Sequence, residues 1–491
     1  MNYASLKFLL FVVALLIIYY VCPKKYRWVT LLIASLIFFY LFSGVLIIYC
    51  ILASLVAYFA SRLLIKNEKK KKLIFIISIL VILGFLAVLK YNNFFISIIN
   101  VFGLSIKYKK FLIPIGISYY TLEMISYMTD IYRKKYEPEK NFFKLLLFFT
   151  YFPKLVEGPI SRYDKLSTTL FSENKFDYDN FRKAFVLIGY GFFKKLVIAD
   201  RAGIFVDTFF SEGYTGLITV VAIVLYTIQI YADFSGCIDI VSGVSELFGV
   251  KLAENFRRPF FSTSIQEFWR RWHITLGEWL KDYIFYPISL SKMNMKLNLK
   301  VRKMKWKHLS RFITVAFPLF FVWFTNGLWH GASGKFVLYG LYYYVIMMLG
   351  VLFKPLLDKL VSLLKINTKV WSYKFFQIIR TIIIVCFGMF LFRCDTLHDF
   401  ANLSTKMLSF GKFPLFSLGI NKFDFVILAI SVLILICIEI AQELGVNIRE
   451  KLEEQNLVFR WIVYLIIIFG VIIFGIYGRG YSAKSFIYGG F

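Results

Sequence analysis

Residues 28–61 read WVTLLIASLIFFYLFSGVLIIYCILASLVAYFAS, and this stretch decides the class of the fold. It carries no Asp, Glu, Lys or Arg before its end, and it is far longer than the roughly 20 apolar residues that one helix needs to cross a bilayer. Ser43 and Gly44 in its middle favour a turn. We therefore predict two short membrane-spanning helices, which suit a locally thinned bilayer.

Apolar runs of the same character continue along the chain. They lie at 5–22, 73–90, 111–129, 181–199, 216–232, 311–329, 334–353, 374–393, 423–443 and 457–477. The first run lacks a basic leader and an A-x-A-like exit, so we expect a retained span and not a signal peptide. With 59% hydrophobic residues and a mean hydropathy of +0.69, the chain is too apolar for a water-soluble domain. We predict an all-α polytopic membrane protein with roughly 11–13 transmembrane and re-entrant helices.

The net charge of +29 is carried by short loops between the apolar runs. This pattern is typical of cytoplasmic loops under the positive-inside rule and of contact with anionic lipid, so we exclude nucleic acid as a partner. Residues 23–27, 62–72 and 291–311 are expected to be cytoplasmic, which places the N-terminus outside. The six cysteines form no C-x-x-C pair and lie mostly in apolar runs, so we expect neither a disulfide framework nor a metal site.

Two apolar regions are interrupted by polar residues, glycine and proline. Residues 142–166 contain Pro153, Gly158 and Pro159, and residues 229–261 contain Asp233, Asp239 and Glu246. Irregular backbone at membrane depth is tolerated only where it is buried in protein or lines a watery cavity. We therefore predict broken, buried backbone in both regions.

Histidine is the natural general base near neutral pH, and the chain has four. His308 and His398 are expected to lie in solvated loops. His330 lies in FTNGLWHGASGKF (324–336), where one apolar run stops and the next begins, among small and polar residues. An ionisable residue at membrane depth is a functional candidate, although a helix-terminal histidine bonded to a neighbour is the plainer alternative.

The fourth histidine lies in SIQEFWRRWHITLGEWLKDYIFYP (264–287), a short segment in which six charged residues are interleaved with tryptophans. If Ser264–Tyr286 is helical, then Trp269, Trp272 and His273 recur on one face with Leu276 and Leu280. The plainer alternative is an amphipathic surface helix with tryptophan anchors, which accounts for the tryptophans but not for His273. We predict a helix that does not span and whose Trp269/Trp272/His273 face contacts the core.

These segments carry a resemblance. The run IYADFSGCIDIVSGVSELFGVKLAENFRRPFFSTSIQEFWRRWHITLGEWLKDYIFYP, followed by GLWHGAS, resembles the membrane-bound O-acyltransferase family, in particular its bacterial branch of alginate O-acetyltransferase-like proteins. Residues 113–133 and 151–163 match the same branch. The resemblance covers about residues 5–395, and departures occur at FFSTS (260–264), at Cys237 and at SGKF (333–336).

The resemblance implies one acyltransferase domain over 1–491, with the family core at about 111–353, further spans at about 374–477, and a ring-like bundle around a central channel. It implies His330 as the catalytic base, with His273 orienting or assisting. The other residues that we expect to line the channel or contact substrate are Trp269, Trp272, Asp233, Asn255, Asp282, Asn326, Trp329 and Ser333. No bound cofactor is implied.

The function implied is transfer of an acyl group, acetyl by preference, from a cytoplasmic thioester to an extracytoplasmic polysaccharide or cell-wall polymer. The donor would be acetyl-CoA or an acyl carrier protein. An exported acyltransferase or polysaccharide synthase machinery is the expected partner, at the plasma membrane of a bacterium. Two alternatives stay open: a teichoic-acid D-alanyl transferase that uses a carrier-protein thioester, and a transporter or channel without chemistry.

The basic loops make the topology testable. We expect Lys69→Cys and Lys300→Cys to resist an impermeant thiol reagent applied to intact cells, because eight Lys and Arg residues in 291–311 would be costly to translocate. Labelling is measured against the parental chain, which carries the six native cysteines. Ready labelling at both positions would overturn this topology.

Overall fold

The computed structural model describes residues 2–109, 111–303, 307–409, 413–477 and 486. In these ranges the regular structure is helical, with one isolated antiparallel bridge between Phe256 and Trp272, so the all-α prediction is confirmed. The chain divides into two compact units. The first contains residues 1–201, 229–254 and 423–491, and the second contains residues 202–228 and 255–422.

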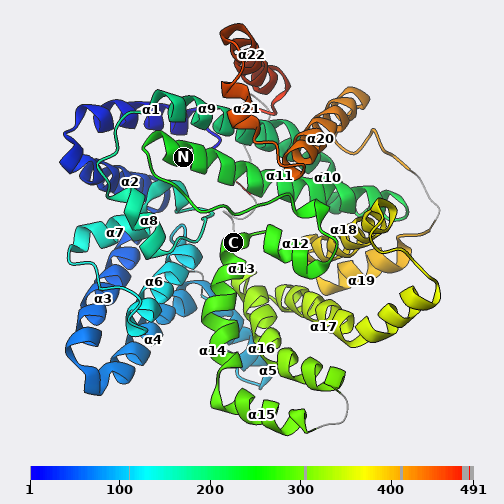
Figure 1. Cartoon of the computed structure of the whole chain (residues 1–491), viewed down its shortest axis with the longest axis horizontal. Coiled ribbons are helices and arrows are strands. Elements are labelled where there is room, and N and C mark those ends of the chain that lie inside the picture. The colour runs from blue at the N-terminus through cyan, green and yellow to red at the C-terminus, as the bar shows by residue number, and fades with distance from the viewer. Residues whose placement is uncertain (1, 110, 304–306, 410–412, 478–485, 487–491) are drawn as a thin grey trace. The chain divides into compact units, whose positions relative to one another are not determined.

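The first unit begins with α1 (Leu6–Val21), α2 (Arg27–Ser43), α3 (Ile47–Lys66), α4 (Lys71–Lys90) and α5 (Asn92–Val101). Then follow α6 (Ile117–Tyr132), α7 (Phe142–Thr150), α8 (Tyr163–Leu170), α9 (Tyr178–Phe192), most of α11 (Ile218–Leu247) and of α20 (Lys422–Glu443), α21 (Ile448–Glu453) and α22 (Leu457–Phe474). The long run 28–61 divides at Gly44, whose φ is +54°, as predicted. The helix α3 packs against α4, α6 and α7 (Figure 1).

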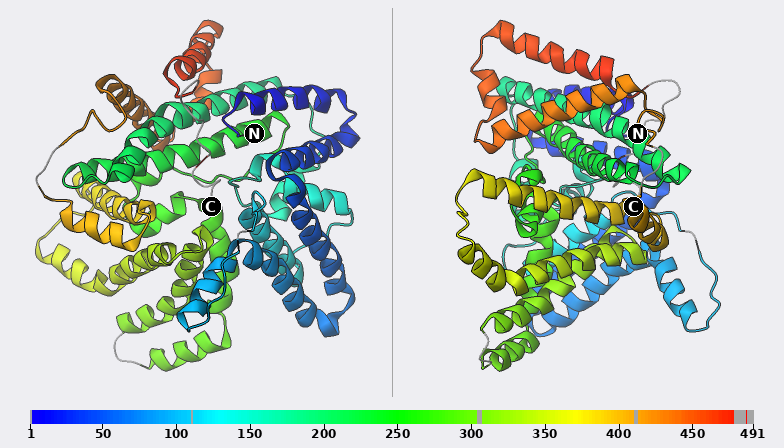
Figure 2. Two further views of the ribbon diagram at one scale, coloured as in Figure 1. Left: turned by 180° about the vertical axis from the view of Figure 1, so that it is seen from behind. Right: turned by 90° about the vertical axis from the view of Figure 1, so that its right-hand side faces the viewer.

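The second unit contains most of α10 (Asp200–Glu212), the short helices α12 to α14, α15 (Lys292–Arg302), α16 (Lys307–His330), α17 (Gly334–Leu363), α18 (Trp371–Arg393) and α19 (Leu397–Lys406). The helices α16 and α17 lie side by side (Figures 1 and 2). Glycines permit this approach, because a Cβ on Gly340 would lie 2.2 Å from the Trp323 carbonyl oxygen and one on Gly327 would lie 2.3 Å from that of Phe336.

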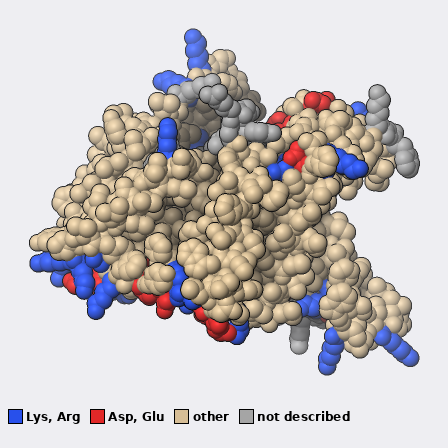
Figure 3. All heavy atoms as spheres, turned by 90° about the horizontal axis from the view of Figure 1, so that it is seen from above, with Lys and Arg blue, Asp and Glu red and all other residues tan. Residues whose placement is uncertain are grey.

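Eight helical segments in the described ranges are long and apolar enough to cross a membrane. Most of the face in Figure 3 is formed by residues other than Lys, Arg, Asp and Glu, as expected of a polytopic membrane protein. Three predicted spans are not among these eight. The run 5–22 forms a shorter apolar helix of 16 residues, 111–129 is helical only from Ile117, and 181–199 lies in an uninterrupted helical stretch in which α9 continues as a π-helix (Phe193–Ala199).

Buried charge sets α6 apart from a span that faces lipid. The helix α6 carries the buried Glu123, which pairs with the buried Lys154. The second Glu123 oxygen accepts from the backbone N–H of Ser161 at 2.9 Å. Lys154 and Ser161 belong to the segment 151–162, which is irregular and buried between α7 and α8. The prediction of broken, buried backbone in 142–166 is therefore confirmed.

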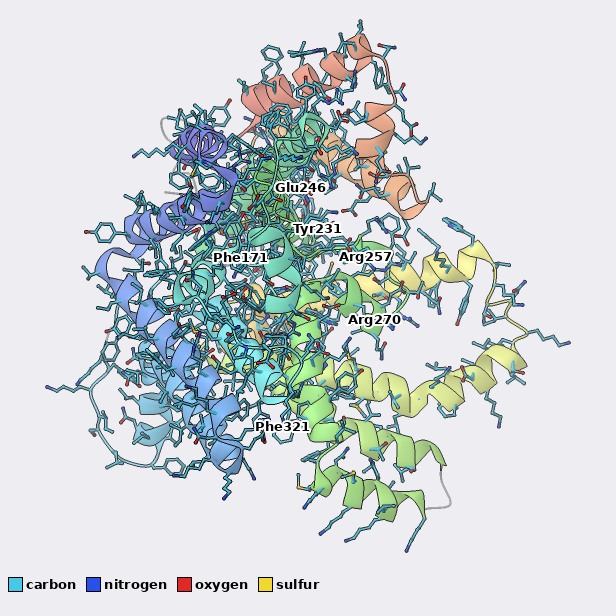
Figure 4. The ribbon with its side chains drawn as sticks, turned by 60° about the vertical axis from the view of Figure 1, so that its left-hand side comes forward. Phe171, Tyr231, Glu246, Arg257, Arg270 and Phe321 are labelled. Atoms are coloured by element: carbon cyan, nitrogen blue, oxygen red, sulfur yellow. The ribbon has the colours of Figure 1, made fainter. Side chains whose placement is uncertain are left out.

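The corresponding prediction for 229–261 is wrong over its first half, because α11 is a continuous helix to Leu247. Its acidic residues are matched by lysines of the π-helix, with Lys195 Nζ 2.6 Å from an Asp233 oxygen and Lys194 Nζ 2.6 Å from an Asp239 oxygen. Gly236 lets α11 lie close to the end of α9, since a Cβ on Gly236 would lie 2.9 Å from the Gly191 carbonyl oxygen. Tyr231 and Glu246, labelled in Figure 4, lie along the same helix.

The Lys195 cluster gives a stability prediction. Lys195 also lies 2.9 Å from Asp200, so Lys195→Met leaves two buried carboxylates without this cation. We expect a loss of about 3–5 kcal/mol in the free energy of unfolding, because an uncompensated buried charge is costly. Thermal unfolding of the purified protein measures it.

The matched control is Lys354→Met, which breaks an exposed i,i+4 pair with Asp358 and should change stability little. Equal effects of the two substitutions would contradict a structural role for the buried cluster.

Candidate active site

The segment 264–287 is not one helix. It forms α12 (Ile265–Arg271), α13 (Ile274–Leu280), a π-helix (Lys281–Phe285) and α14 (Tyr286–Ser289). Ser264 caps α12, with its hydroxyl accepting from the Glu267 N–H at 3.2 Å. The break falls at Trp272, which is extended, and at His273, which has φ +46° and ψ +52° in the left-handed region. The predicted continuous helix is therefore wrong, although no piece is long enough to span, as predicted.

A second piece of chain causes the break. Residues 255–257 run antiparallel to residues 271–274. The Arg257 N–H donates to the Arg271 carbonyl at 2.8 Å, and the Ile274 N–H donates to the Asn255 carbonyl at 2.9 Å. Figure 4 labels Arg257 in the first stretch and Arg270, which directly precedes the second. The pairing satisfies backbone groups that a continuous helix would have satisfied locally.

The Asn255 side chain is the centre of a small buried cluster. Its Oδ1 accepts from the Thr275 N–H at 3.2 Å and from the Thr275 hydroxyl at 2.8 Å. The same oxygen lies 3.2 Å from His273 Nδ1. Asn255, Thr275 and His273 are all buried, so this cluster holds the imidazole in place from inside the protein.

His273 lies in an environment that favours neutral imidazole. Its side chain is 3% exposed, and burial lowers its pKa from 6.5 to about 3. The ring centroid lies 5.5 Å from that of Trp329. A neutral imidazole near an aromatic wall has the protonation state that a general base or a hydrogen-bond acceptor requires.

His330 is the last residue of α16 and is also 3% exposed. Its ring centroid lies 4.9 Å from that of Trp329, 5.7 Å from Tyr339 and 5.3 Å from Phe392. Both imidazoles therefore lie next to the indole of Trp329. A Cβ on Gly331 would lie 2.3 Å from the Phe336 ring, so glycine is needed here for close packing.

The structure brings most of the predicted site residues into the second unit. Trp272 is buried against Phe256 and Phe268, and Trp269 packs on Trp323 and Tyr343, so both tryptophans contact the core as predicted. Asn326 is buried on α16, and Asp282 and Ser333 are half-buried. Asp233 lies in the first unit, with Lys195 as its partner.

Three neighbours of the histidines were not predicted from the sequence. Thr275 shares Asn255 with His273, and the rings of Tyr339 and Phe392 lie next to His330. Thr275 could have been noticed as the hydroxyl two residues after His273. No spacing in the sequence links Phe392 to His330. Among the described residues, no group of three or more His, Cys, Asp or Glu could hold a metal ion.

The part of the chain that contains both histidines is similar to known proteins. Residues 139–393, which include both histidines, match the model of the membrane-bound O-acyltransferase family. A probable alginate O-acetylase of Pseudomonas syringae is 32% identical over 70% of this chain and 62% of its own length. A peptidoglycan O-acetyltransferase of Helicobacter pylori is 29% identical over 54% of this chain and 53% of its own.

A teichoic acid D-alanyltransferase of Bacillus subtilis is 28% identical over 58% of this chain and 69% of its own length. The match spans less than two thirds of the first alginate relative, at 62% of its length. These proteins differ in the acyl group and the polymer that their names give. The comparison therefore leaves the acyl group and the acceptor polymer of this chain open.

The break at His273 can be tested apart from chemistry. His273→Asn and His273→Val both remove the imidazole, but asparagine adopts the left-handed conformation far more readily than a β-branched residue. We expect the valine variant to be less stable than the asparagine variant by about 1–2 kcal/mol. Thermal unfolding of the two purified variants measures the difference. Equal stability would argue against the left-handed backbone at this position.

Proposed function

Because the chain belongs to the membrane-bound O-acyltransferase family, we propose that it is an acyltransferase that moves an acetyl group from a cytoplasmic thioester to an extracytoplasmic polysaccharide or cell-wall polymer. The observation that carries the proposal is the pair of buried histidines beside Trp329, inside the matched region. Attack by a sugar hydroxyl on a thioester needs a group that accepts the hydroxyl proton, and an imidazole can do so.

In the proposed reaction, His330 accepts the proton of the acceptor hydroxyl as the hydroxyl oxygen attacks the thioester carbonyl. The carbon–sulfur bond then breaks, and the thiolate takes the proton from the imidazolium. His273 assists or orients. One preorganised donor that stabilises the oxyanion can contribute about 3–4 kcal/mol. Acetyl-CoA or an acyl carrier protein is the proposed donor, and no resident cofactor takes part.

The names of the relatives support acetyl as the acyl group. An alginate O-acetylase and a peptidoglycan O-acetyltransferase are among them, whereas the D-alanyltransferase matches at lower identity. D-Alanyl transfer to teichoic acid is the second candidate, since that relative is matched over 69% of its own length. Purified protein supplied with labelled acetyl-CoA, in parallel with D-alanyl carrier protein, distinguishes the two.

The chain is a multi-pass membrane protein. We propose that it resides in the plasma membrane of a bacterium, with its basic loops against anionic lipid and the donor on the cytoplasmic side. An exported acyltransferase or a polysaccharide synthase complex would complete delivery to the polymer.

The four histidines give the catalytic prediction. We expect His330→Ala to lower acyl transfer about 100- to 10,000-fold, the usual cost of losing a general base. His273→Ala should lower it less. The measurement is the rate at which label from acetyl-CoA reaches the acceptor, with protein abundance recorded for each variant.

His398→Ala and His308→Ala are the controls, and both should transfer at the parental rate; the His398 side chain is 89% exposed. A well-expressed His330→Ala protein with the parental rate would contradict the proposal. Equal losses in all four variants would indicate general destabilisation.

A further inference from the structure

We propose that Asn255 is a positioning residue that keeps the proton of His273 on Nδ1 and leaves Nε2 as a hydrogen-bond acceptor. The inference rests on the proposed function, because it specifies what the second imidazole contributes to acyl transfer. It starts from three groups that meet one oxygen atom: the Thr275 N–H, the Thr275 hydroxyl and His273 Nδ1, at 3.2, 2.8 and 3.2 Å from Asn255 Oδ1.

The oxygen end of the Asn255 amide faces the cluster. The oxygen and nitrogen of an amide are assigned from their hydrogen-bond partners. A backbone N–H can only donate, so the Asn255 atom that faces the Thr275 N–H must be the oxygen. The Thr275 hydroxyl can donate to the same oxygen. The local network is therefore consistent with only one orientation of the amide.

An amide oxygen only accepts, so His273 Nδ1 must carry a proton to form its hydrogen bond with Asn255. Burial keeps the imidazole neutral, with its pKa lowered to about 3. A neutral imidazole carries one proton, so Nε2 keeps a lone pair. His273 then accepts a proton or a hydrogen bond at Nε2 and does not stabilise an oxyanion there.

Asn255 is held firmly enough to determine which nitrogen of His273 carries the proton. Asn255 is 1% exposed, and its carbonyl accepts from the Ile274 N–H at 2.9 Å. Asn255 thus binds Ile274 through its main chain, and His273 and Thr275 through its side chain. In water, both neutral tautomers are accessible, but here the cluster selects one.

The direct test reads the tautomer itself. The full-length protein has four histidines, so ¹³C,¹⁵N-histidine labelling in lipid bilayers gives four imidazole signals, and His273→Gln identifies the one of interest. At neutral pH we expect His273 to be protonated at Nδ1 only. A signal protonated at Nε2, or at both nitrogens, in the parental protein would overturn the proposal without any Asn255 variant.

Two substitutions then separate positioning from packing. Asn255→Asp keeps an acceptor oxygen and should keep the proton on Nδ1, whereas Asn255→Leu keeps the volume and should release the tautomer. We expect Asn255→Leu to lower acyl transfer about 10- to 10,000-fold, the upper bound being the cost of a wrong histidine tautomer in serine hydrolases. Retention of Nδ1 protonation in a folded Asn255→Leu protein would count against the proposal.

The transfer assay and the tautomer measurement test the two proposals separately. Absence of acyl transfer by the parental protein would reject the proposed function, while the tautomer signal would still report on Asn255. Parental transfer with the proton on Nε2 would reject the role of Asn255 and leave the function standing. Thermal unfolding of both Asn255 variants shows whether a loss of transfer reflects loss of the fold.

Discussion

The antiparallel pairing of residues 255–257 with residues 271–274 is the interaction on which the candidate site depends. An irregular backbone that is buried in protein must satisfy its N–H and C=O groups with protein partners. The two backbone hydrogen bonds of 2.8 and 2.9 Å meet this demand where α12 ends. They also hold the chain on both sides of His273, whose backbone is left-handed with φ +46° and therefore leaves the helical path.

In the first unit, ion pairs satisfy buried charged groups, as the backbone hydrogen bonds satisfy buried polar groups at the candidate site. Lys154 with Glu123, Lys194 with Asp239, and Lys195 with Asp233 place buried cations beside buried or largely buried carboxylates. A buried pair of this kind adds little net stability, but loss of one partner is costly. Charged residues at membrane depth therefore need not mark a functional site. Asp233 is an example, because its ion pair with Lys195 is a structural reason for a buried carboxylate.

The sequence could predict features set by neighbours along the chain. Hydropathy identified the all-helical membrane class, and Ser43 and Gly44 marked the division of the run 28–61. Contacts between residues far apart in the sequence could not be predicted. Lys195 meets Asp233 across 38 positions, so the polar residues of α11 suggested a broken backbone where the helix is continuous. The regular spacing of Trp269, Trp272 and Leu276 suggested one helix, since nothing in it reveals the pairing with Asn255.

The surroundings of the two histidines differ, and the difference bears on their roles. Burial decides that His273 is neutral, but burial by itself does not decide which nitrogen carries the proton. That decision needs a group of fixed hydrogen-bonding character, and Asn255 Oδ1 is one because the Thr275 N–H defines it as an acceptor. His330 lies instead among the rings of Trp329, Tyr339 and Phe392. Two similar groups in different environments are how proteins divide acid and base tasks. With its proton on Nδ1, His273 can accept a hydrogen bond from a hydroxyl at Nε2, and the Trp329 indole beside its ring also lies beside His330.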